Sequence, residues 1–315
     1  MLSRTADHLF WMSRYIERAE NLARLLDVTW QMSMVPQSEE AANQSWNAII
    51  ALNSLEAAYA AKYSTVNGDN VLRFMVTDHD NYASILSCLR LARENAHAVR
   101  GTLTTEMWET LNATWLEARM MSFEQIMNGG LGDFFEWVKM RSSLSRGTTL
   151  GTLLQDEAFH FIRLGTLLER ADNTARILDV KYHVLRPHGD EGATDFYQWG
   201  ALLRSVSGFE VYRKVYRDVI TPERVAELLI LHSDMPRSLR FCLNGVVKNL
   251  GLVSNRHSDE TVRRAGQLYS QLRYGLIDEI LKDGLHEWLT DFMDRIYLLG
   301  DGISKDFLVP MAETA

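Results

Sequence analysis

A charged segment occurs twice in this chain of 315 residues, and this repeat constrains the fold more than any other feature. Residues 6–28 align with residues 158–180 without a gap, and 11 of the 23 positions are identical. Six identical positions are polar: His8, Glu17, Arg18, Asn21, Arg24 and Asp27 match His160, Glu169, Arg170, Asn173, Arg176 and Asp179. A shared fold requires only the apolar spacing to recur. The repetition of a charged series residue by residue therefore indicates a shared structural or functional role.

The apolar residues of both segments recur in steps of three and four, which is the spacing of one face of an α-helix. The first of these helices is expected to run from about Thr5 to Met32. Strand-like alternation is lacking elsewhere. The prolines stand between segments of helical periodicity, at Pro36, Pro187, Pro222, Pro236 and Pro310. The chain is therefore predicted to be all-α.

The second half of the chain retraces the first half beyond the repeated segment. The further matches pair Trp46 with Trp199, Tyr59 with Tyr212, Cys88 with Cys242, and residues 80–89 with residues 234–243. We therefore predict two tandem helical-bundle repeats, residues 1–147 and 148–315, related by a pseudo-twofold axis and packed as one compact unit. The cysteines hold equivalent positions in the two copies, which favours buried free thiols over a disulfide between them.

Local signals divide the first half into shorter helices. Residues 39–63 are expected to form one helix, and residues 77–80 are expected to cap the helix that follows them. The hydroxyl- and glycine-rich stretch 141–152 is interpreted as a linker with capping residues before the second copy. In the alternative interpretation, its backbone amides, with Arg141 and Arg146, hold a phosphate or carboxylate at a helix start.

Composition and charge argue against several classes of function. The formal net charge of −8 argues against a nucleic-acid-binding protein, which normally presents a basic surface. The N-terminal segment is charged and no stretch approaches the ~18 uncharged residues of a membrane span, so we expect no signal peptide and no membrane segment. The chain is expected in the cytoplasm. No Walker, dinucleotide-binding, nucleophile-elbow, kinase or zinc-spaced cysteine motif is present, so no cofactor is expected.

The repeated polar residues form a row beside the apolar stripe of each helix. Within a row, an arginine can pair with the acids on either side, as Arg24 can with Glu20 and Asp27. A solvated face of salt bridges would contribute only ~0–1 kcal/mol per pair, too little to constrain the same residues twice. A network buried between helices would constrain them, because removing one member of a buried pair costs roughly 3–5 kcal/mol. A ligand-binding or catalytic site is the other open interpretation.

Ser13 and Gly165 are the smallest residues of the two rows and hold matching positions. Small residues allow two backbones to approach closely, so the two helices are expected to cross there. Such a crossing would bring together the acid/base candidates of an enzyme, namely His8, Glu17, His160 and Glu169. A metal held by Glu157, His160 and His8 is an alternative, although only the second copy has the Glu-x-x-His spacing of di-iron bundles.

The crossing is also expected to enclose an excess of acidic charge. Each row holds three acids and one arginine: Glu17, Glu20 and Asp27 with Arg24, and Glu169, Asp172 and Asp179 with Arg176. A buried acidic excess is costly unless the carboxyl groups protonate or a cation is supplied. An amine-bearing peptide or small molecule is therefore the expected ligand.

Several short motifs occur in order along the chain. They are the doubled Glu17-Arg18 and Glu169-Arg170, Asp156-Glu-Ala-Phe-His-Phe-Ile-Arg-Leu-Gly165, Ala92-Arg-Glu-Asn-Ala96 with Arg100, Glu106-Met-Trp108, and Leu202-Leu-Arg-Ser-Val-Ser207. Together they resemble the bacterial alpha-E family, a helical family named for its Glu-Arg motif, over essentially the whole chain. The resemblance implies association with a circularly permuted ATP-grasp protein and a transglutaminase-like protein. Such systems are proposed to make or modify peptides by ATP-dependent amide-bond formation.

Two functions remain open. In the first, the chain is a non-catalytic partner that binds the ligase or its peptide product. In the second, it is an enzyme that acts on that product through the acid/base candidates named above. The ligand-binding residues are expected to be the remaining polar residues of the repeat: Arg18, Asn21, Arg24, Asp27, Arg170, Asn173, Arg176 and Asp179.

Overall fold

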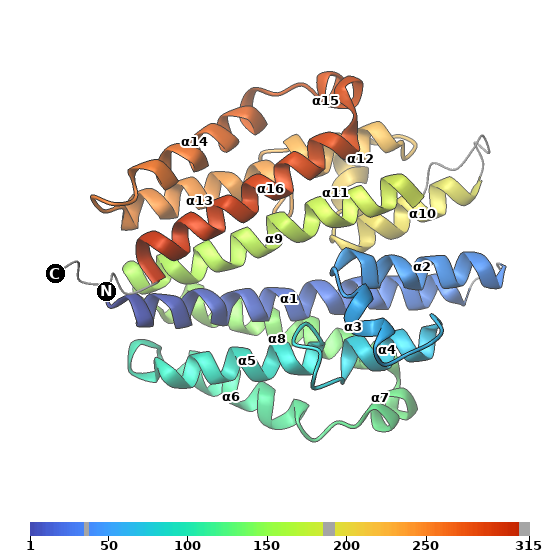
Figure 1. Cartoon of the computed structure of the whole chain (residues 1–315), viewed down its shortest axis with the longest axis horizontal. Coiled ribbons are helices and arrows are strands. Elements are labelled where there is room, and N and C mark those ends of the chain that lie inside the picture. The colour runs from blue at the N-terminus through green and yellow to red at the C-terminus, as the bar shows by residue number, and fades with distance from the viewer. Residues whose placement is uncertain (35–37, 185–192, 309–315) are drawn as a thin grey trace.

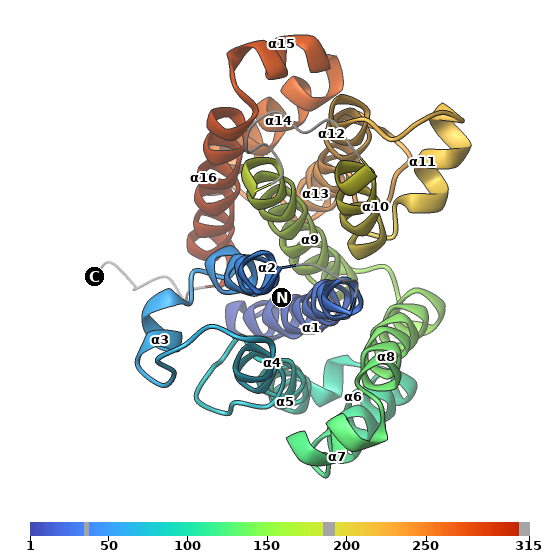
Figure 2. The same ribbon diagram turned by 90° about the vertical axis from the view of Figure 1, so that its right-hand side faces the viewer.

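Two long helices, α1 (Ser3–Ser33) and α9 (Glu157–Val184), cross at the centre of the molecule and start at the same end of it (Figure 1). The computed structural model describes residues 1–34, 38–184 and 193–308, and these form sixteen α-helices and no strand. The all-α prediction is confirmed. Helices of the first half pack on one side of the crossing pair and helices of the second half on the other (Figure 2).

The remaining helices follow in chain order. Those of the first half are α2 (Glu39–Leu52), α3 (Glu56–Ala60), α4 (Gly68–Val76), α5 (Ile85–Ala98), α6 (Thr105–Ala118), α7 (Phe123–Gly129) and α8 (Leu131–Thr152), with a 3-10 turn η1 (Arg100–Thr102). Those of the second half are α10 (Ala193–Ser205), α11 (Phe209–Tyr216), α12 (Pro222–Leu231), α13 (Leu239–Val253), α14 (Asp259–Tyr274), α15 (Ile277–Asp283) and α16 (Leu285–Ile303), with a π-helical turn η2 (Ser304–Leu308). None of the helices in the described ranges is long and apolar enough to cross a membrane.

The close approach of α1 and α9 depends on a glycine. A Cβ atom placed on Gly165 would collide with the Oγ of Ser13 and with the carbonyl oxygen of Phe10. No residue larger than glycine fits there unless the helix backbones separate. The predicted crossing at Ser13 and Gly165 is confirmed, and it places the two polar rows next to each other.

Equivalent residues of the two halves make equivalent contacts. The Tyr59 hydroxyl donates to the Thr65 carbonyl at 3.0 Å, and the Tyr212 hydroxyl donates to the Val219 carbonyl at 2.8 Å. Each copy also places a non-glycine residue in the left-handed region soon after its second helix, α2 or α10. In the first copy this residue is Ser54, with a φ of 55°. In the other copy Ser207 has a φ of 54°. These matched contacts support a duplication, and the pseudo-twofold axis itself stays a prediction.

A second pair of equivalent positions starts α5 and α13. Ser84 accepts a hydrogen bond from the Ser87 amide at 3.2 Å, and Ser238 accepts one from the Phe241 amide at 3.0 Å. Both serines are fully buried, and each cap satisfies an amide in the first turn of its helix. Ser84, and not the stretch 77–80, is therefore the N-cap of its helix, which corrects that expectation.

The first half departs from prediction at the stretch 39–63. It forms two helices, α2 and α3, because the chain turns at Asn53 and Ser54, where Ser54 adopts its left-handed conformation. The turn matters for the site described below, since its residues line a cavity. Of the prolines expected at boundaries, Pro222 lies in the first turn of α12, whereas Pro36, Pro187 and Pro310 lie outside the described residues.

The interpretation of residues 141–152 as a linker is wrong, because they form the C-terminal half of α8. Serine and threonine favour caps and turns by hydrogen-bonding local backbone groups. Here their hydroxyls bond the preceding helical turn instead: Thr149 donates to the Ser145 carbonyl at 2.8 Å and Thr152 to the Thr148 carbonyl at 2.7 Å. Arg141 and Arg146 consequently do not stand at a helix start, so the alternative interpretation, an anion site at a helix start, is also wrong. The expected boundary at residue 147 falls inside α8, and the division into 1–147 and 148–315 stays a prediction.

Cys88 and Cys242 are free and fully buried, so the structure contains no disulfide between them. Burial raises the pKa of each thiol to about 12, mainly because the thiolate would lose its hydration. The preference for buried free thiols is confirmed.

Candidate functional site

The two Glu-Arg pairs of the repeat bond to each other across the crossing of α1 and α9. Arg170 donates from Nε and Nη2 to the two oxygens of Glu17, both at 2.8 Å. Arg18 donates to the two oxygens of Glu169, at 2.6 and 3.0 Å. Adjacent residues of a helix point in different directions, so a glutamate and the arginine after it cannot pair with each other. Each pair instead holds the opposite pair, in the bidentate geometry that makes arginine–carboxylate bonds strong.

Both glutamates lie inside the protein, with Glu17 1% exposed and Glu169 5% exposed. Burial alone would raise the pKa of Glu169, but the charges and hydrogen bonds of Arg18 and Arg14 outweigh it and lower the pKa to about 2. Arg14 adds a further bond to Glu169 at 2.7 Å. Burial likewise opposes ionisation of Glu17, and Arg170 and Arg237 lower its pKa below the ordinary value. Both carboxylates are therefore held ionised.

We call these four residues and the side chains bonded to them the ER network. Arg237, which directly precedes the N-cap of α13, extends it on the side of Glu17. Its guanidinium donates from Nη1 to Glu17 at 3.0 Å and to the Asn21 side-chain oxygen at 2.6 Å, and from Nη2 to Glu20 at 2.7 Å. Arg237 itself is 6% exposed. We call the place that its guanidinium occupies the Arg237 site.

Helix α8 completes the network from the stretch that the sequence indicated as a linker. Arg146 bonds Glu20 and also the Ser142 hydroxyl, the latter at 2.9 Å, and Ser142 donates to Glu20 at 2.7 Å. Sequence reasoning did not assign Arg14, Ser142 or Arg237 to the site, since none of them is an identical position of the repeat. It noted Arg146 for a different reason, and no local signal connected it to Glu20, 126 residues away.

The buried-network interpretation of the polar rows is therefore supported, with corrections at their ends. Arg24 bonds Glu20 and Arg176 bonds Asp172, as their spacing predicts, although both arginines are partly exposed. Asp27 does not pair with Arg24 but with Lys139 of α8, at 2.8 Å. Asp179 bonds His286 of α16 at 2.7 Å. The last acid of each row is therefore bonded to a residue of another helix.

The prediction of an excess of acidic charge at the crossing is wrong. The network and the adjacent Asp172–Arg176 pair bring together four carboxylates, those of Glu17, Glu20, Glu169 and Asp172. They meet seven guanidinium groups, those of Arg14, Arg18, Arg24, Arg146, Arg170, Arg176 and Arg237. Arginines from outside the repeat, which a count of the two rows cannot include, reverse the balance.

The histidines do not join the glutamates. The Nδ1 atom of His8 lies 2.8 Å from the side-chain oxygen of Asn95, and that of His160 lies 2.9 Å from the corresponding oxygen of Asn249. These bonds hold the imidazoles against α5 and α13, so the expected cluster of His8, Glu17, His160 and Glu169 does not form. Asn95 and Asn249, like the histidines, hold equivalent positions in the two copies.

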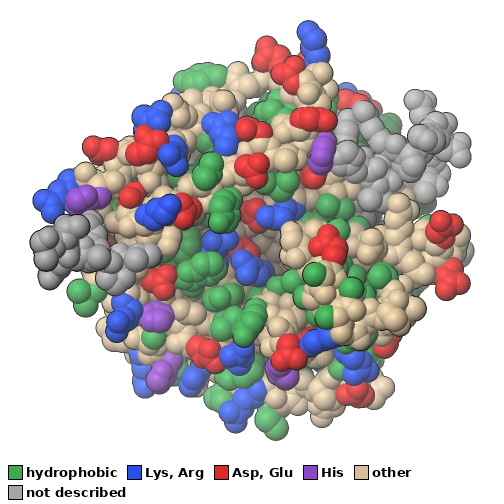
Figure 3. Space-filling view, in the orientation of Figure 1, with side chains coloured by type: hydrophobic (Ala, Val, Ile, Leu, Met, Phe, Trp, Pro, Cys, Tyr) green, Lys and Arg blue, Asp and Glu red, His purple; other side chains and the backbone are tan. Residues whose placement is uncertain are grey.

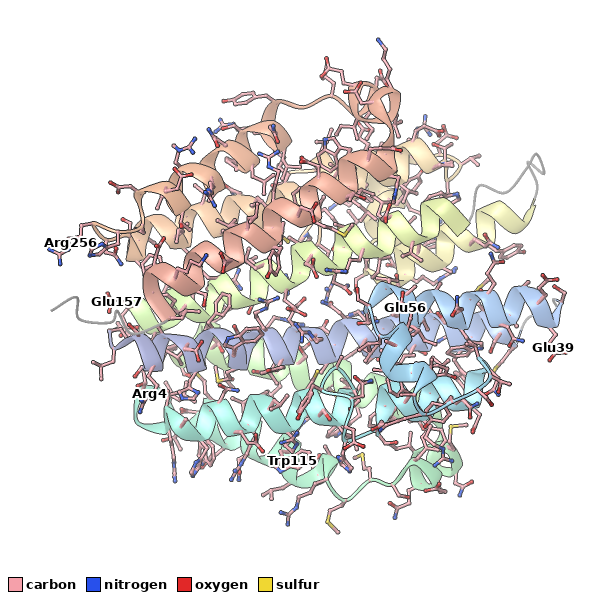
Figure 4. All side chains as sticks on the ribbon, viewed as in Figure 1. Arg4, Glu39, Glu56, Trp115, Glu157 and Arg256 are labelled. Carbon is pink, nitrogen blue, oxygen red and sulfur yellow. The ribbon has the colours of Figure 1, made fainter. Side chains whose placement is uncertain are left out.

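The alternative metal site has no geometric support either. Glu157 bonds the N-terminal amine of Met1 at 2.5 Å. Figure 4 places it at the start of α9, beside the start of α1. Within the described ranges, no three histidine, cysteine, aspartate or glutamate side chains are grouped so as to hold a metal ion.

A cavity of about 280 Å³ opens beside the network, on the side of Glu169. We call it the open cavity. It lies between α1 and α9 and is bordered by the turn after α2 and by the residue before the N-cap of α5. Its lining is Arg18, Asn21, Leu22, Leu25, Leu52, Asn53, Ser54, Ala83, Glu169, Asp172, Asn173 and Arg176. Figure 3 shows the molecule hollowed near its centre, with acidic and basic side chains around the hollow.

A neighbouring cavity of about 330 Å³ lies toward α16 and shares Arg18, Asp172 and Arg176 with the open cavity. Of the predicted ligand-binding residues, Arg18, Asn21, Asn173 and Arg176 line the open cavity. Arg24, Asp27, Arg170 and Asp179 do not line it, and their side chains bond Glu20, Lys139, Glu17 and His286.

Residues 1–308 match a protein family described as a predicted alpha-helical domain with a conserved ER motif. The chain belongs to the Alpha-E family. The doubled Glu-Arg pairs that carried the resemblance form the centre of its fold. No solved structure matches this Alpha-E chain.

Curated relatives of the Alpha-E chain include uncharacterized proteins of Mycobacterium bovis and Mycobacterium tuberculosis. Each is 23% identical over 318 aligned positions, which cover 93% of this chain but 35% of the relative. The chain thus spans about a third of the length of the relatives that it matches. Their length leaves room for further domains beside an Alpha-E unit.

Proposed function

We propose that this Alpha-E chain is a cytoplasmic, non-catalytic partner in a circularly permuted ATP-grasp and transglutaminase-like system that makes or modifies peptides by ATP-dependent amide-bond formation. In this role it binds the ligase or its peptide product at the open cavity. The association follows from the family resemblance. The observation that favours binding over catalysis is that arginines hold the two central glutamates, Glu17 and Glu169, in the ionised form.

A general acid or base acts best when its pKa is near the working pH. The pKa of Glu169 is about 2, and the pKa of Glu17 is also lowered. Both oxygens of each carboxylate already accept hydrogen bonds from arginine. Each of His8 and His160 has Nδ1 against an asparagine and no bond to either glutamate. These groups are arranged to fix two helices and to shape a cavity, and the enzyme hypothesis has no observation in its favour.

The open cavity combines features of a recognition site. It is slightly smaller than the ~300–1,000 Å³ of small-molecule sites, so it suits one side chain or one small group of a larger partner. The apolar side chains of Leu22, Leu25 and Leu52 line it together with charged and amide groups, and the rigid crossing of α1 and α9 supports it. Such pre-organisation limits the entropy lost on binding.

The direct test is co-elution of the purified chain with a circularly permuted ATP-grasp protein from the same organism, at micromolar concentration, by size-exclusion chromatography with mass detection. The wild-type chain is expected to shift to the mass of a complex. Asn173→Leu is expected to abolish the shift, because it replaces the amide on the cavity wall with apolar groups of the same shape, and Asn173 makes no hydrogen bond to the described residues that the change would remove.

The matched control is Arg263→Ala, which removes an exposed ion pair with Glu260 on α14. It is expected to co-elute like the wild type. Separate elution of the wild-type chain and the ATP-grasp protein would overturn the proposed association. A complex that forms equally well with Asn173→Leu would remove the cavity from the proposal.

A further inference from the structure

The duplication allows two equivalent places in the molecule to be compared. Arg237 directly precedes Ser238, the N-cap of α13, and Ala83 directly precedes Ser84, the N-cap of α5. The two residues therefore stand at the same point of the two copies. Arg237 reaches into the ER network, whereas Ala83 ends at the wall of the open cavity.

The acceptors that hold Arg237 recur around the open cavity. In the Arg237 site, the guanidinium binds Glu17, Glu20 and Asn21. The equivalent residues in the other copy are Glu169, Asp172 and Asn173, and all three line the cavity beside Ala83. The open cavity is thus the Arg237 site of the other copy without its arginine.

The recurring acceptors have unused capacity. Asn173 makes no hydrogen bond to the described residues, and only one oxygen of Asp172 accepts a bond, from Arg176. The Oε1 atom of Glu169 accepts from Arg18 alone, whereas the Oε1 atom of Glu17 accepts from both Arg170 and Arg237. Each acceptor that Arg237 uses therefore has a counterpart in the open cavity that can accept one more hydrogen bond.

A second observation comes from Asn21, which lines the open cavity from α1 and is 3% exposed. Its side-chain oxygen accepts from Arg237, but its NH2 group has no partner among the described residues. A buried amide donor without a partner costs free energy. An acceptor oxygen on a bound ligand would satisfy it.

The surrounding charge does not prevent a further cation from binding. Without Arg237, its site has the carboxylates of Glu17 and Glu20 facing three guanidinium groups, from Arg24, Arg146 and Arg170. The open cavity has the carboxylates of Glu169 and Asp172, with three guanidinium groups bonded to them, from Arg14, Arg18 and Arg176. The formal balance is the same, and the first site accommodates a fourth guanidinium.

We propose that the open cavity binds the guanidinium group of an arginine side chain, supplied by a peptide or by a free arginine-like molecule. The group bonds Glu169, Asp172 and Asn173 in the way that Arg237 bonds their counterparts, and a neighbouring oxygen of the ligand accepts from Asn21. The planar guanidinium reaches three acceptors from two nitrogens, which a single ammonium cannot reproduce. The ligand class deepens the proposed function and rests on it only for the source of the arginine.

The test is calorimetric titration of the intact chain with agmatine, with N-acetyl-arginine amide, with a short peptide containing one arginine, and with N-acetyl-lysine amide. At least one guanidinium probe is expected to bind saturably and about tenfold or more tightly than the lysine probe, since one lost charge-assisted bond changes affinity by about that factor. Equal affinity for agmatine and the peptide identifies the guanidinium group as sufficient and contradicts the bond from Asn21, because agmatine has no acceptor oxygen. Tighter binding of the peptide identifies a peptide-borne arginine. Absence of saturable binding by every guanidinium probe, or equal binding of the lysine probe, overturns the proposal.

The decisive variant is Ala83→Arg, which places in the open cavity the side chain that the other copy already has. It is expected to fold and to reduce affinity for the guanidinium probes at least about tenfold. Ala58→Arg adds the same side chain at an exposed position of α3 and is expected to bind like the wild type. Should Ala83→Arg fail to fold, Asn173→Leu supplies the same test. Unchanged affinity in the variant that folds contradicts the proposal.

These titrations need no ATP-grasp protein. A chain that binds guanidinium probes but does not co-elute with the ligase contradicts the proposed association alone. A chain that co-elutes with the ligase but does not bind the guanidinium probes contradicts only the proposed class of ligand.

Discussion

Replacing Glu169 with glutamine isolates the contribution of one buried carboxylate to the fold. The substitution keeps the shape of the side chain but removes the charge that faces Arg14 and Arg18. It also turns one acceptor oxygen into an NH2 donor that meets the donors of an arginine. We expect the variant to fold and to be markedly less stable than the wild type.

Two independent routes give the size of the effect. The pKa of Glu169 falls from 4.5 to about 2, and at about 1.36 kcal/mol per pKa unit this difference corresponds to about 3 kcal/mol. Breaking a buried ion pair by removing one partner costs roughly 3–5 kcal/mol in other proteins. Glu169 is 5% exposed, so solvent screening does not reduce the first value much. The expected loss is about 3–4 kcal/mol.

Urea denaturation followed by circular dichroism measures this loss. With an m-value of about 3 kcal/mol per molar, the midpoint is expected to fall by about 1 M. The matched control is Glu157→Gln on the same helix, where the carboxylate is 52% exposed and pairs with the N-terminal amine. That variant is expected to change stability by less than about 1 kcal/mol. A midpoint for Glu169→Gln close to that of the control would refute the reasoning.

The pH dependence provides a second check with a definite sign. A carboxyl group with a lowered pKa stabilises the fold fully above its unfolded pKa, near 4.5, and this contribution is lost as the pH falls toward the folded value of about 2. The difference in stability between wild type and Glu169→Gln should therefore be constant above about pH 5 and shrink below it. A difference that grows with acidity would contradict the assignment.

Two further outcomes follow from the packing. Gly165→Ala is expected to destabilise the protein by about 1–3 kcal/mol in the same denaturation assay, because its Cβ meets the backbone of α1. The control is Gly266→Ala on α14, where a Cβ meets nothing within 4 Å, and it is expected to stabilise the protein by about 0.5–1 kcal/mol. A gain in stability at both sites would contradict the tight crossing. Cys88 and Cys242 are expected to resist a thiol reagent at pH 8 in the native protein and to react fully in urea, since burial raises the pKa of both thiols to about 12; rapid labelling of the native chain would contradict their burial.

The sequence was sufficient for the fold class and for the central pair of helices. Both depend on local periodicity and on a repeat that can be read without knowing any tertiary contact. The crossing at Ser13 and Gly165 was also predictable, because two small residues in matching register indicate close approach on general steric grounds. The burial of Glu17 and Glu169 was predicted because a buried ion pair, unlike an exposed one, contributes enough free energy to keep the same charged residues in both copies.

The partners of those glutamates were much harder to predict. Arg237 lies 220 residues from Glu17 in the sequence, and Arg146 lies 126 residues from Glu20. Contacts between residues so far apart in the sequence produce no periodic pattern that could reveal them. Arg146 was also hard to recognise, because a stretch rich in serine, threonine and glycine has low helix propensity. Its helix packs against α1 and α6, and such tertiary contacts can override propensity.

The prediction of a cationic ligand still has support, although the charge count that first suggested it is wrong. Counting charges along two rows indicated an acidic pocket, and the arginines from α8 and from the start of α13 make that count wrong. What supports a cationic ligand instead is the difference between two equivalent residues, Ala83 and Arg237. In one copy the protein supplies its own guanidinium to a glutamate, a second acid and an asparagine. In the other copy the same three residue types border a cavity in which that guanidinium is missing. An internal duplicate of this kind gives more information than a charge balance, because it shows the geometry of an occupied site within the same fold.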